Sequence, residues 1–165
     1  MPVLTSIHVA KGRRLPMRAV EGATVEAGKG IVGDRYHGTR HRHVSVQSAA
    51  ALRAASEVFG ADVPAELTRR NLTVDDGVVP TTPGSLIRIG NVLLEVVRVA
   101  APCKLLDDTL GRGAQEALRR RGGSICRVLV GGEIAIGDPV DLDADPAWRD
   151  TVATSTPLQP HARLP

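Results

Sequence analysis

The sequence predicts a mainly β domain, a closed or nearly closed β-barrel with two or three short helices. Short runs rich in β-branched residues recur along the chain, and many are bounded by glycine or proline. The pair Gly90-Asn91 accepts positive φ between two such runs, which indicates a tight hairpin. Regular short strands with turn signals at this spacing favour a barrel over a parallel α/β sheet.

The expected strands follow these runs in chain order. They cover residues 3–9, 17–27, 43–47, 71–74, 85–89, 92–99, 125–130, 133–136 and 139–142. Gly131-Gly132 stands between two of them and predicts a second hairpin turn.

Two segments have a helical period. In residues 48–59 apolar side chains recur at three- and four-residue steps, and Gly60 offers a C-cap, so we expect a helix that lies across the barrel. The second helix is expected over residues 113–121. Its three final arginines, 119–121, are explained as cations at a helix C-terminus, where the helix dipole favours them.

The chain of 165 residues suits one domain, which we expect to cover residues 1–142. Residues 143–165 are expected to form a proline-containing tail, because their hydrophobic content is too thin to repay the ordering of the backbone. No function is assigned to this tail.

The composition restricts the location and the partners. Two cysteines are too few for a disulfide framework, and the N-terminal segment has no apolar stretch of the secretory kind, so we expect a cytoplasmic protein. The most apolar run, 92–99, contains Glu95 and Arg98, which argues against a membrane span.

Lysine and arginine outnumber aspartate and glutamate by 21 to 18, and most of the cations are arginine, whose planar fork suits phosphate and carboxylate groups. We therefore expect an anionic ligand. Three aromatic residues, Tyr36, Phe59 and Trp148, leave little on which bases could stack, so we expect no nucleic-acid partner.

Cys103 is the first candidate for chemistry. The preceding Pro102 is expected to end a strand, which leaves the thiol on a loop or at a barrel rim. Lys104 beside it favours the thiolate that nucleophilic attack or metal ligation requires. The alternative is a buried, inert cysteine. Cys126 alternates with valines along a strand and is expected in the core.

A glycine-rich loop over residues 30–38 is the second candidate. Its glycines would let backbone N–H groups face an anion, and Arg35, Arg40 and Arg42 would add charge-assisted hydrogen bonds. Alternatively, Gly33-Asp34 is only a tight turn in which Asp34 bonds its own backbone.

Histidines 37, 41 and 43 raise the possibility of a zinc site, but the sequence has neither a Cys-x-x-Cys pair nor a His-Glu-x-x-His helix. Arg69 and Asn71 stand two residues apart and share one face of a strand, where they could grip a carbonyl or a phosphate. A solvated charged strand end is the alternative for this pair.

The order of these motifs resembles the MOSC family, named for the C-terminal domain of molybdenum-cofactor sulfurases. The matching segments are 30–37, 42–45, 69–72, 84–90, 101–103, 123 with 127–129, and 132–138, and together they extend over roughly residues 3–142. The resemblance implies a β-barrel of the kind also seen in a domain of pyruvate kinase.

It further implies that the cofactor is molybdenum cofactor, or molybdopterin. Cys103 would ligate molybdenum, and Arg69 and Asn71 would contact the pterin. The remaining candidates for cofactor binding are Gly33, Asp34, Arg35, Arg42, Lys104 and Arg127.

The leading hypothesis is an oxidoreductase component that acts on N-hydroxylated small molecules. In the alternative, Cys103 carries sulfane sulfur from a PLP-dependent cysteine desulfurase, with no PLP bound by this chain itself. A third hypothesis is an anionic-ligand or cofactor-delivery module without chemistry.

The sequence departs from longer relatives. It shows no second barrel domain, no ferredoxin-type cysteine cluster and no desulfurase domain, so electrons or sulfur are expected from a separate electron-transfer protein or desulfurase. An oligomer is compatible with these features. Arg70 stands where longer relatives often have proline.

Overall fold

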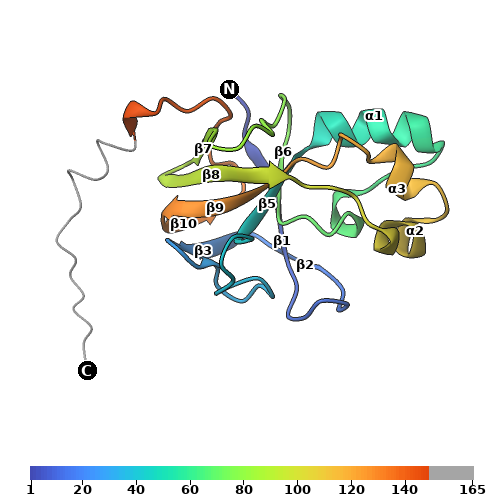
Figure 1. Cartoon of the computed structure of the whole chain (residues 1–165), viewed down its shortest axis with the longest axis horizontal. Coiled ribbons are helices and arrows are strands. Elements are labelled where there is room, and N and C mark those ends of the chain that lie inside the picture. The colour runs from blue at the N-terminus through green and yellow to red at the C-terminus, as the bar shows by residue number, and fades with distance from the viewer. Residues whose placement is uncertain (149–165) are drawn as a thin grey trace.

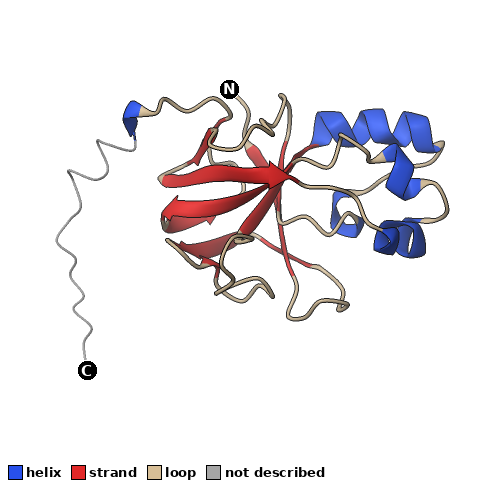
Figure 2. Ribbon diagram, in the orientation of Figure 1, coloured by secondary structure: helices blue, strands red, loops and turns tan. Residues whose placement is uncertain are grey.

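A computed structural model describes residues 1–148 and confirms the mainly β class with short helices (Figures 1 and 2). The strands form two sheets. The larger contains, in spatial order, β11 (Val140–Asp141), β7 (Leu86–Ile89), β8 (Val92–Val99), β9 (Ser124–Val130), β5 (Val44–Ser48), β6 (Leu72–Val74), β1 (Leu4–Val9) and β2 (Arg18–Val20). The smaller contains β10 (Gly132–Ala135), β3 (Gly22–Glu26) and β4 (Gly30–Ile31).

The larger sheet curls without becoming a closed barrel within residues 1–148. Near its two ends, β1 and β11 are linked by an isolated bridge between Val3 and Pro139. The backbone N–H of Leu4 donates to the Asp138 carbonyl at 3.0 Å beside this bridge. Two further backbone hydrogen bonds flank the bridge, from the Gly137 N–H to the Leu4 carbonyl at 2.7 Å and from the Val140 N–H to the Pro2 carbonyl at 2.9 Å. This contact between the ends of the sheet is short, because β11 has only two residues.

The main core lies between the strands and is formed by buried aliphatic side chains. Cys126 is fully buried in it, as the alternation with valines predicts. Burial raises the pKa of the Cys126 thiol to about 12, so this cysteine stays neutral. The core members with almost no exposure include Leu4, Ile7, Ile31, Val46, Leu72, Leu94 and Val140.

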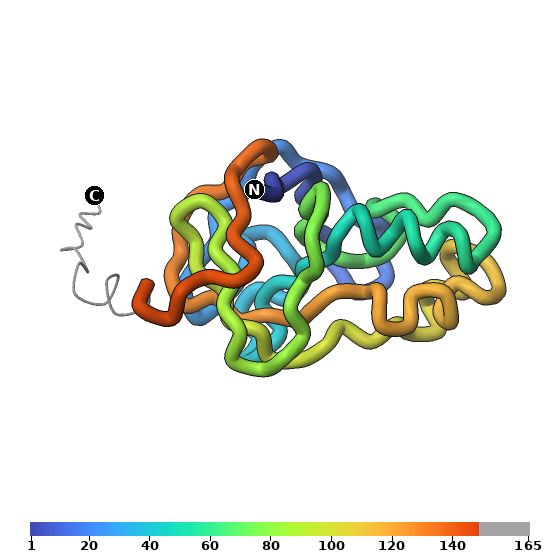
Figure 3. The backbone as a smooth tube through the Cα atoms, turned by 90° about the horizontal axis from the view of Figure 1, so that it is seen from above, coloured from blue at the N-terminus to red at the C-terminus, as the bar shows by residue number. Residues whose placement is uncertain are grey.

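The helices gather at one end of the larger sheet, which Figure 3 shows from above. They are α1 (Ala49–Phe59), α2 (Lys104–Leu110) and α3 (Ala114–Ala117), and a 3-10 turn, η1 (Ala65–Leu67), lies near them. The predicted first helix is confirmed, with Ser48 as its N-cap and Gly60 in the left-handed conformation at its end. It does not lie across a barrel, because its apolar face packs against Leu106, Ala114 and Leu118 in a second small core.

The second helix differs from the prediction. The helical residues after Gly113 are only 114–117, and the unexpected helix α2 begins directly after Cys103. A four-residue helix has little dipole, so the helix dipole is a weaker explanation for the arginines that follow α3.

The hairpin at Gly90-Asn91 is confirmed, because Ile89 pairs with Val92. The prediction of a hairpin at Gly131-Gly132 is wrong, since β9 pairs with β8 and β5 whereas β10 pairs with β3. Here the chain passes between the sheets so closely that a Cβ on Gly131 would lie 2.5 Å from the Val25 carbonyl oxygen.

The expected strand over residues 17–27 is divided, because β2 belongs to the larger sheet and β3 to the smaller. The predicted tail begins with an ordered segment, in which Ala144 is buried against Leu86 and Leu93. The rest of the predicted tail, 149–165, lies outside the described residues. In the part that is described, no helix is long and apolar enough to cross a bilayer.

A substitution at Gly123, just before β9, would show how closely β9 approaches β5. Gly123 has φ of +82°, and a Cβ there would lie 1.8 Å from the Val46 carbonyl oxygen. Gly60 has φ of +84° with open space around it. We predict that Gly60→Ala costs about 1 kcal/mol of unfolding free energy and Gly123→Ala at least about 3 kcal/mol, measured by urea unfolding. Equal losses would show that the close approach at Gly123 contributes nothing.

Candidate functional site

Cys103 lies where the larger sheet meets the helices. Strand β8 ends at Val99, the chain continues through Pro102, and Cys103 is the N-cap residue of α2, with an extended backbone. The thiol is exposed, so the alternative of a buried, inert cysteine is excluded. Cys103 is therefore accessible to a ligand or to another protein.

Arg70 holds the segment that leads to Cys103. Its Nη2 donates to the carbonyls of Ala100 and Ala101 at 3.3 and 3.2 Å, and its Nε donates to the carbonyl of Gly122 at 3.1 Å. The side chain is buried. Burial lowers the pKa of Arg70 to about 10, with the positive charge of Arg42 acting in the same direction, so Arg70 remains charged at neutral pH.

Three arginines interact electrostatically with Cys103. Burial lowers the pKa of Arg42, Arg69 and Arg70, and in each case a negative charge at Cys103 acts in the opposite direction. The sulfur is therefore within electrostatic range of all three guanidinium groups. Such a concentration of positive charge in a partly buried setting attracts anions. We call Arg42, Arg69 and Arg70 the arginine cluster.

Tyr36 organises one side of this cluster. Its ring lies between two guanidinium groups, with Arg35 at 4.4 Å and Arg42 at 4.3 Å from the ring centre. Arg35 Nη2 also donates to the Arg69 carbonyl at 3.2 Å. The glycine-rich loop and the start of β6 are thereby joined, and the orientation of Arg42 is fixed by stacking.

Asp34 anchors this loop rather than facing solvent. Its buried carboxylate accepts hydrogen bonds from the backbone N–H groups of Ala10 and Tyr36 and from Arg35 Nη1. The tight-turn alternative therefore describes Asp34 well, because it bonds its own backbone two residues on. Gly33 beside it has φ of +90° and open space where a Cβ would stand.

Arg69 and Asn71 are also engaged with the protein. Arg69 has φ of +66°, and its guanidinium donates to the carbonyls of Arg13 and Leu15. Asn71 is 1% exposed, its Oδ1 accepts from the backbone N–H and hydroxyl of Ser45, and its Nδ2 donates to the His8 carbonyl. The solvated strand-end alternative does not describe this pair, and contact with a pterin stays a prediction.

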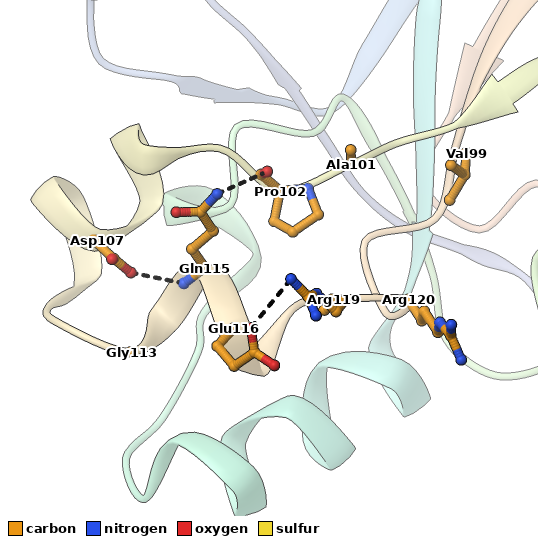
Figure 4. Close-up of a pocket in the computed structure, with 9 residues that line it drawn as sticks. All are labelled: Val99, Ala101, Pro102, Asp107, Gly113, Gln115, Glu116, Arg119 and Arg120. Atoms are coloured by element: carbon orange, nitrogen blue, oxygen red, sulfur yellow. Dashed lines mark hydrogen bonds and ion pairs between the residues drawn. The ribbon is translucent and has the colours of Figure 1, made fainter.

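Two hollows border the segment that carries Cys103. One of about 490 Å³ is lined by Ala101 and Pro102 together with α3 residues (Figure 4). The other, about 340 Å³, includes Met17, Arg69 and Leu105 in its lining. The sequence prediction did not identify the first of these.

The comparison with known families decides the identity of the domain. The sequence model of the MOSC domain matches residues 33–141, which is more than half of the chain. The chain belongs to the MOSC domain family. The match includes the arginine cluster and Cys103.

Solved structures share this fold. The YUAD protein from Bacillus subtilis has a TM-score of 0.73 at 17% identity, and the match covers 85% of this chain and 94% of that one. YiiM from Geobacillus stearothermophilus has a TM-score of 0.67 at 16% identity, with 94% and 85% covered. YiiM from Escherichia coli has a TM-score of 0.67 at 16% identity, with 96% and 80% covered. No curated protein sequence matches.

The remaining candidates of this MOSC domain are more dispersed. Lys104 is exposed at the start of α2, next to Cys103. Arg127 forms an ion pair with Glu95 across the β8–β9 ladder. His43 is buried, and its Nδ1 accepts from the Val128 N–H, so its Nε2 carries the hydrogen that is donated to the Thr39 carbonyl. His37 Nε2 instead lies 2.7 Å from Glu26 Oε1.

Sequence reasoning missed two residues of this site. The sequence marks Arg70 only as a departure from proline, and strand alternation does not predict its contacts, because Arg70 and Asn71 precede β6, which begins at Leu72. Tyr36 was not singled out, although arginines stand at 35 and 42 around it. The roles of Arg70 and Tyr36 both depend on contacts with residues that are distant in the sequence.

We predict that Arg70→Met lowers the unfolding free energy by about 3 kcal/mol, because up to three buried carbonyls lose a charged donor. Alkylation of Cys103 by iodoacetamide should also slow severalfold, because a positive charge near the thiolate is lost. Urea unfolding and mass spectrometry measure the two effects.

Arg70→Lys is the matched comparison, since it keeps the charge but cannot bond the carbonyls as a planar fork. It should restore much of the alkylation rate and less of the stability. A stability equal to wild type in Arg70→Met would contradict the role assigned to Arg70.

Proposed function

We propose that this MOSC domain binds molybdenum cofactor through Cys103 and serves as the reductase component for N-hydroxylated small molecules. One observation carries the proposal: an exposed thiol stands within electrostatic range of three arginines. A thiolate is a soft ligand that suits a thiophilic metal, and guanidinium groups suit the phosphate of a pterin.

The residues present fit such a group. The Nε atoms of Arg35 and Arg42 are buried and have no hydrogen-bond partner in the part of the chain that is described. Unsatisfied buried donors are costly, and an anionic oxygen would supply the missing acceptor. The stacking of both arginines on Tyr36 limits the entropy lost when they bind.

Four residues of the site have distinct tasks in this proposal. Cys103 provides the sulfur ligand, Arg42 and Arg69 bind anionic oxygens, and Arg70 positions the loop. When bound, the cofactor supplies two-electron redox chemistry. In the overall reaction the N–O bond of the N-hydroxylated substrate is broken, and two electrons and two protons yield the amine and water. A separate electron-transfer protein provides the electrons.

The test is the molybdenum content of protein purified from a cofactor-competent host. We predict molybdenum in the wild type and at least a tenfold loss in Cys103→Ser, because serine oxygen is a hard donor. Cys126→Ala is the matched control, since Cys126 is buried in the core and should not affect metal content. Absence of molybdenum from the wild type, or its full retention in Cys103→Ser, would refute metal ligation by Cys103.

The exposure of Cys103 also favours a second candidate, a sulfur carrier. The Cys103 thiolate would attack the outer sulfur of a cysteine desulfurase persulfide. An S–S bond would form on Cys103 and another would break, which leaves the desulfurase cysteine as a thiolate.

This candidate predicts that Cys103 gains the mass of one sulfur atom after incubation with a desulfurase, cysteine and PLP, and that Cys126 does not. Peptide mass spectrometry measures the change. An unmodified Cys103 in a protein that carries molybdenum would reject it. If Cys103→Ala binds the cofactor as the wild type does, the site binds an anion without using the thiol.

A further inference from the structure

The cavity of about 490 Å³ beside Pro102 is separate from the arginine cluster in its lining. Its walls come from three places: the end of β8 with the loop that follows, helix α2, and the segment from α3 to Arg120. Small-molecule sites in proteins have volumes of about 300–1,000 Å³. This cavity is therefore large enough for a small organic ligand.

One wall carries positive charge. Figure 4 shows the Arg119 guanidinium between Glu116 and Pro102. Arg119 and Glu116 form an ion pair at 3.6 Å in which both side chains are about 70% exposed. Such an exposed pair contributes little to stability, so a ligand anion can replace Glu116 at small cost.

No side-chain contact within residues 1–148 explains the left-handed backbone conformation of Arg120. Its backbone is in the left-handed region with φ of +64°, which costs a non-glycine residue about 1–2 kcal/mol. Its side chain makes no hydrogen bond or ion pair with any residue in 1–148. Arg121 differs, because its Nη1 donates to the Ala117 carbonyl and caps α3. Strain of this kind is concentrated at ligand sites.

The opposite wall is apolar and adjoins Cys103. Val99 is 43% exposed, and Pro102 lies across from Arg119. Gln115 connects the two walls, because its Nε2 donates to the Pro102 carbonyl at 3.4 Å. The Gln115 backbone N–H donates to Asp107 Oδ1 at 2.8 Å. A ligand in the cavity would thus contact the residue that precedes the thiol.

We propose that this cavity binds a small amphipathic organic anion, with a carboxylate or phosphate group on Arg119 and Arg120 and an apolar body against Val99 and Pro102. The inference goes beyond the proposed cofactor site and requires neither metal nor the thiol. Occupancy would place an organic anion next to Cys103.

The test titrates the full chain with benzoate and with phenyl phosphate, and uses benzyl alcohol as the neutral probe. Isothermal calorimetry gives the affinity, and amide chemical shifts locate the site. Both anions are expected to bind, to shift the amides of Gln115 and Ala101, and to weaken with added salt. The tighter anion identifies the preferred head group. Failure of both anions to bind at millimolar concentration overturns the proposal.

The double variant Arg119→Gln, Arg120→Gln should weaken binding about tenfold, which corresponds to about 1.4 kcal/mol. Arg53→Gln is the control, because Arg53 is an exposed arginine on α1 outside the cavity lining. Equal affinity in the double variant, or shifts confined to the arginine cluster, would overturn the proposal. Circular dichroism confirms that each variant is folded.

Cys103→Ser separates this inference from the proposed function. Binding of the anions should persist in this variant, whether or not it retains molybdenum. Loss of anion binding with the thiol would show that the cavity is not an independent site and would contradict the inference, whereas loss of molybdenum alone bears only on the cofactor.

Discussion

The buried guanidinium of Arg70 is the interaction on which this end of the molecule depends. It connects the start of β6, the end of β8 and the turn before β9 through three carbonyls. A buried charge is costly unless it is fully hydrogen-bonded, and here the carbonyl dipoles compensate for the lost hydration. Because Ala100 and Ala101 are held, Cys103 emerges at a fixed place between the sheet and the helices. The turn that Arg70 binds also requires glycine at 122, because a Cβ there would lie 2.7 Å from the Ala100 carbonyl oxygen.

The next residue, Asn71, also lies just before β6 and performs a matching task between strands. The Asn71 amide links Ser45 in β5 to His8 in β1, so one buried side chain fixes the register of three strands. The pair β5–β6 is the parallel one in this sheet, and parallel strands need a crossover that α1 begins. Two adjacent polar residues thus determine both the sheet geometry and the position of the thiol.

Local patterns predicted most of the strands, the first helix and the exposed position of Cys103, because these depend on alternation, helical period and proline. They failed where two distant segments decide the outcome. Gly131-Gly132 has the composition of a hairpin turn, yet the chain here passes from one sheet to the other and lies close to the Val25 backbone. Arg69 and Asn71 were expected to contact a ligand, which stays a prediction, and the structure shows that both also bond the protein's own carbonyls and hydroxyl. A donor that suits a phosphate suits a backbone carbonyl equally well, so residue type alone could not distinguish the two uses.

The segment after β11 lies at the opposite end of the larger sheet from α1, α2 and α3 (Figure 1), and it carries the single tryptophan of the chain, Trp148. Its ring packs near Leu86 and Leu93, and the Arg88 guanidinium stacks over it at 4.7 Å. Fluorescence from this indole therefore reports whether the segment after β11 is docked on β7 and β8. If that segment detaches before the core opens, the emission changes while the ellipticity of the strands persists, and the chain carries its own optical probe of that one contact.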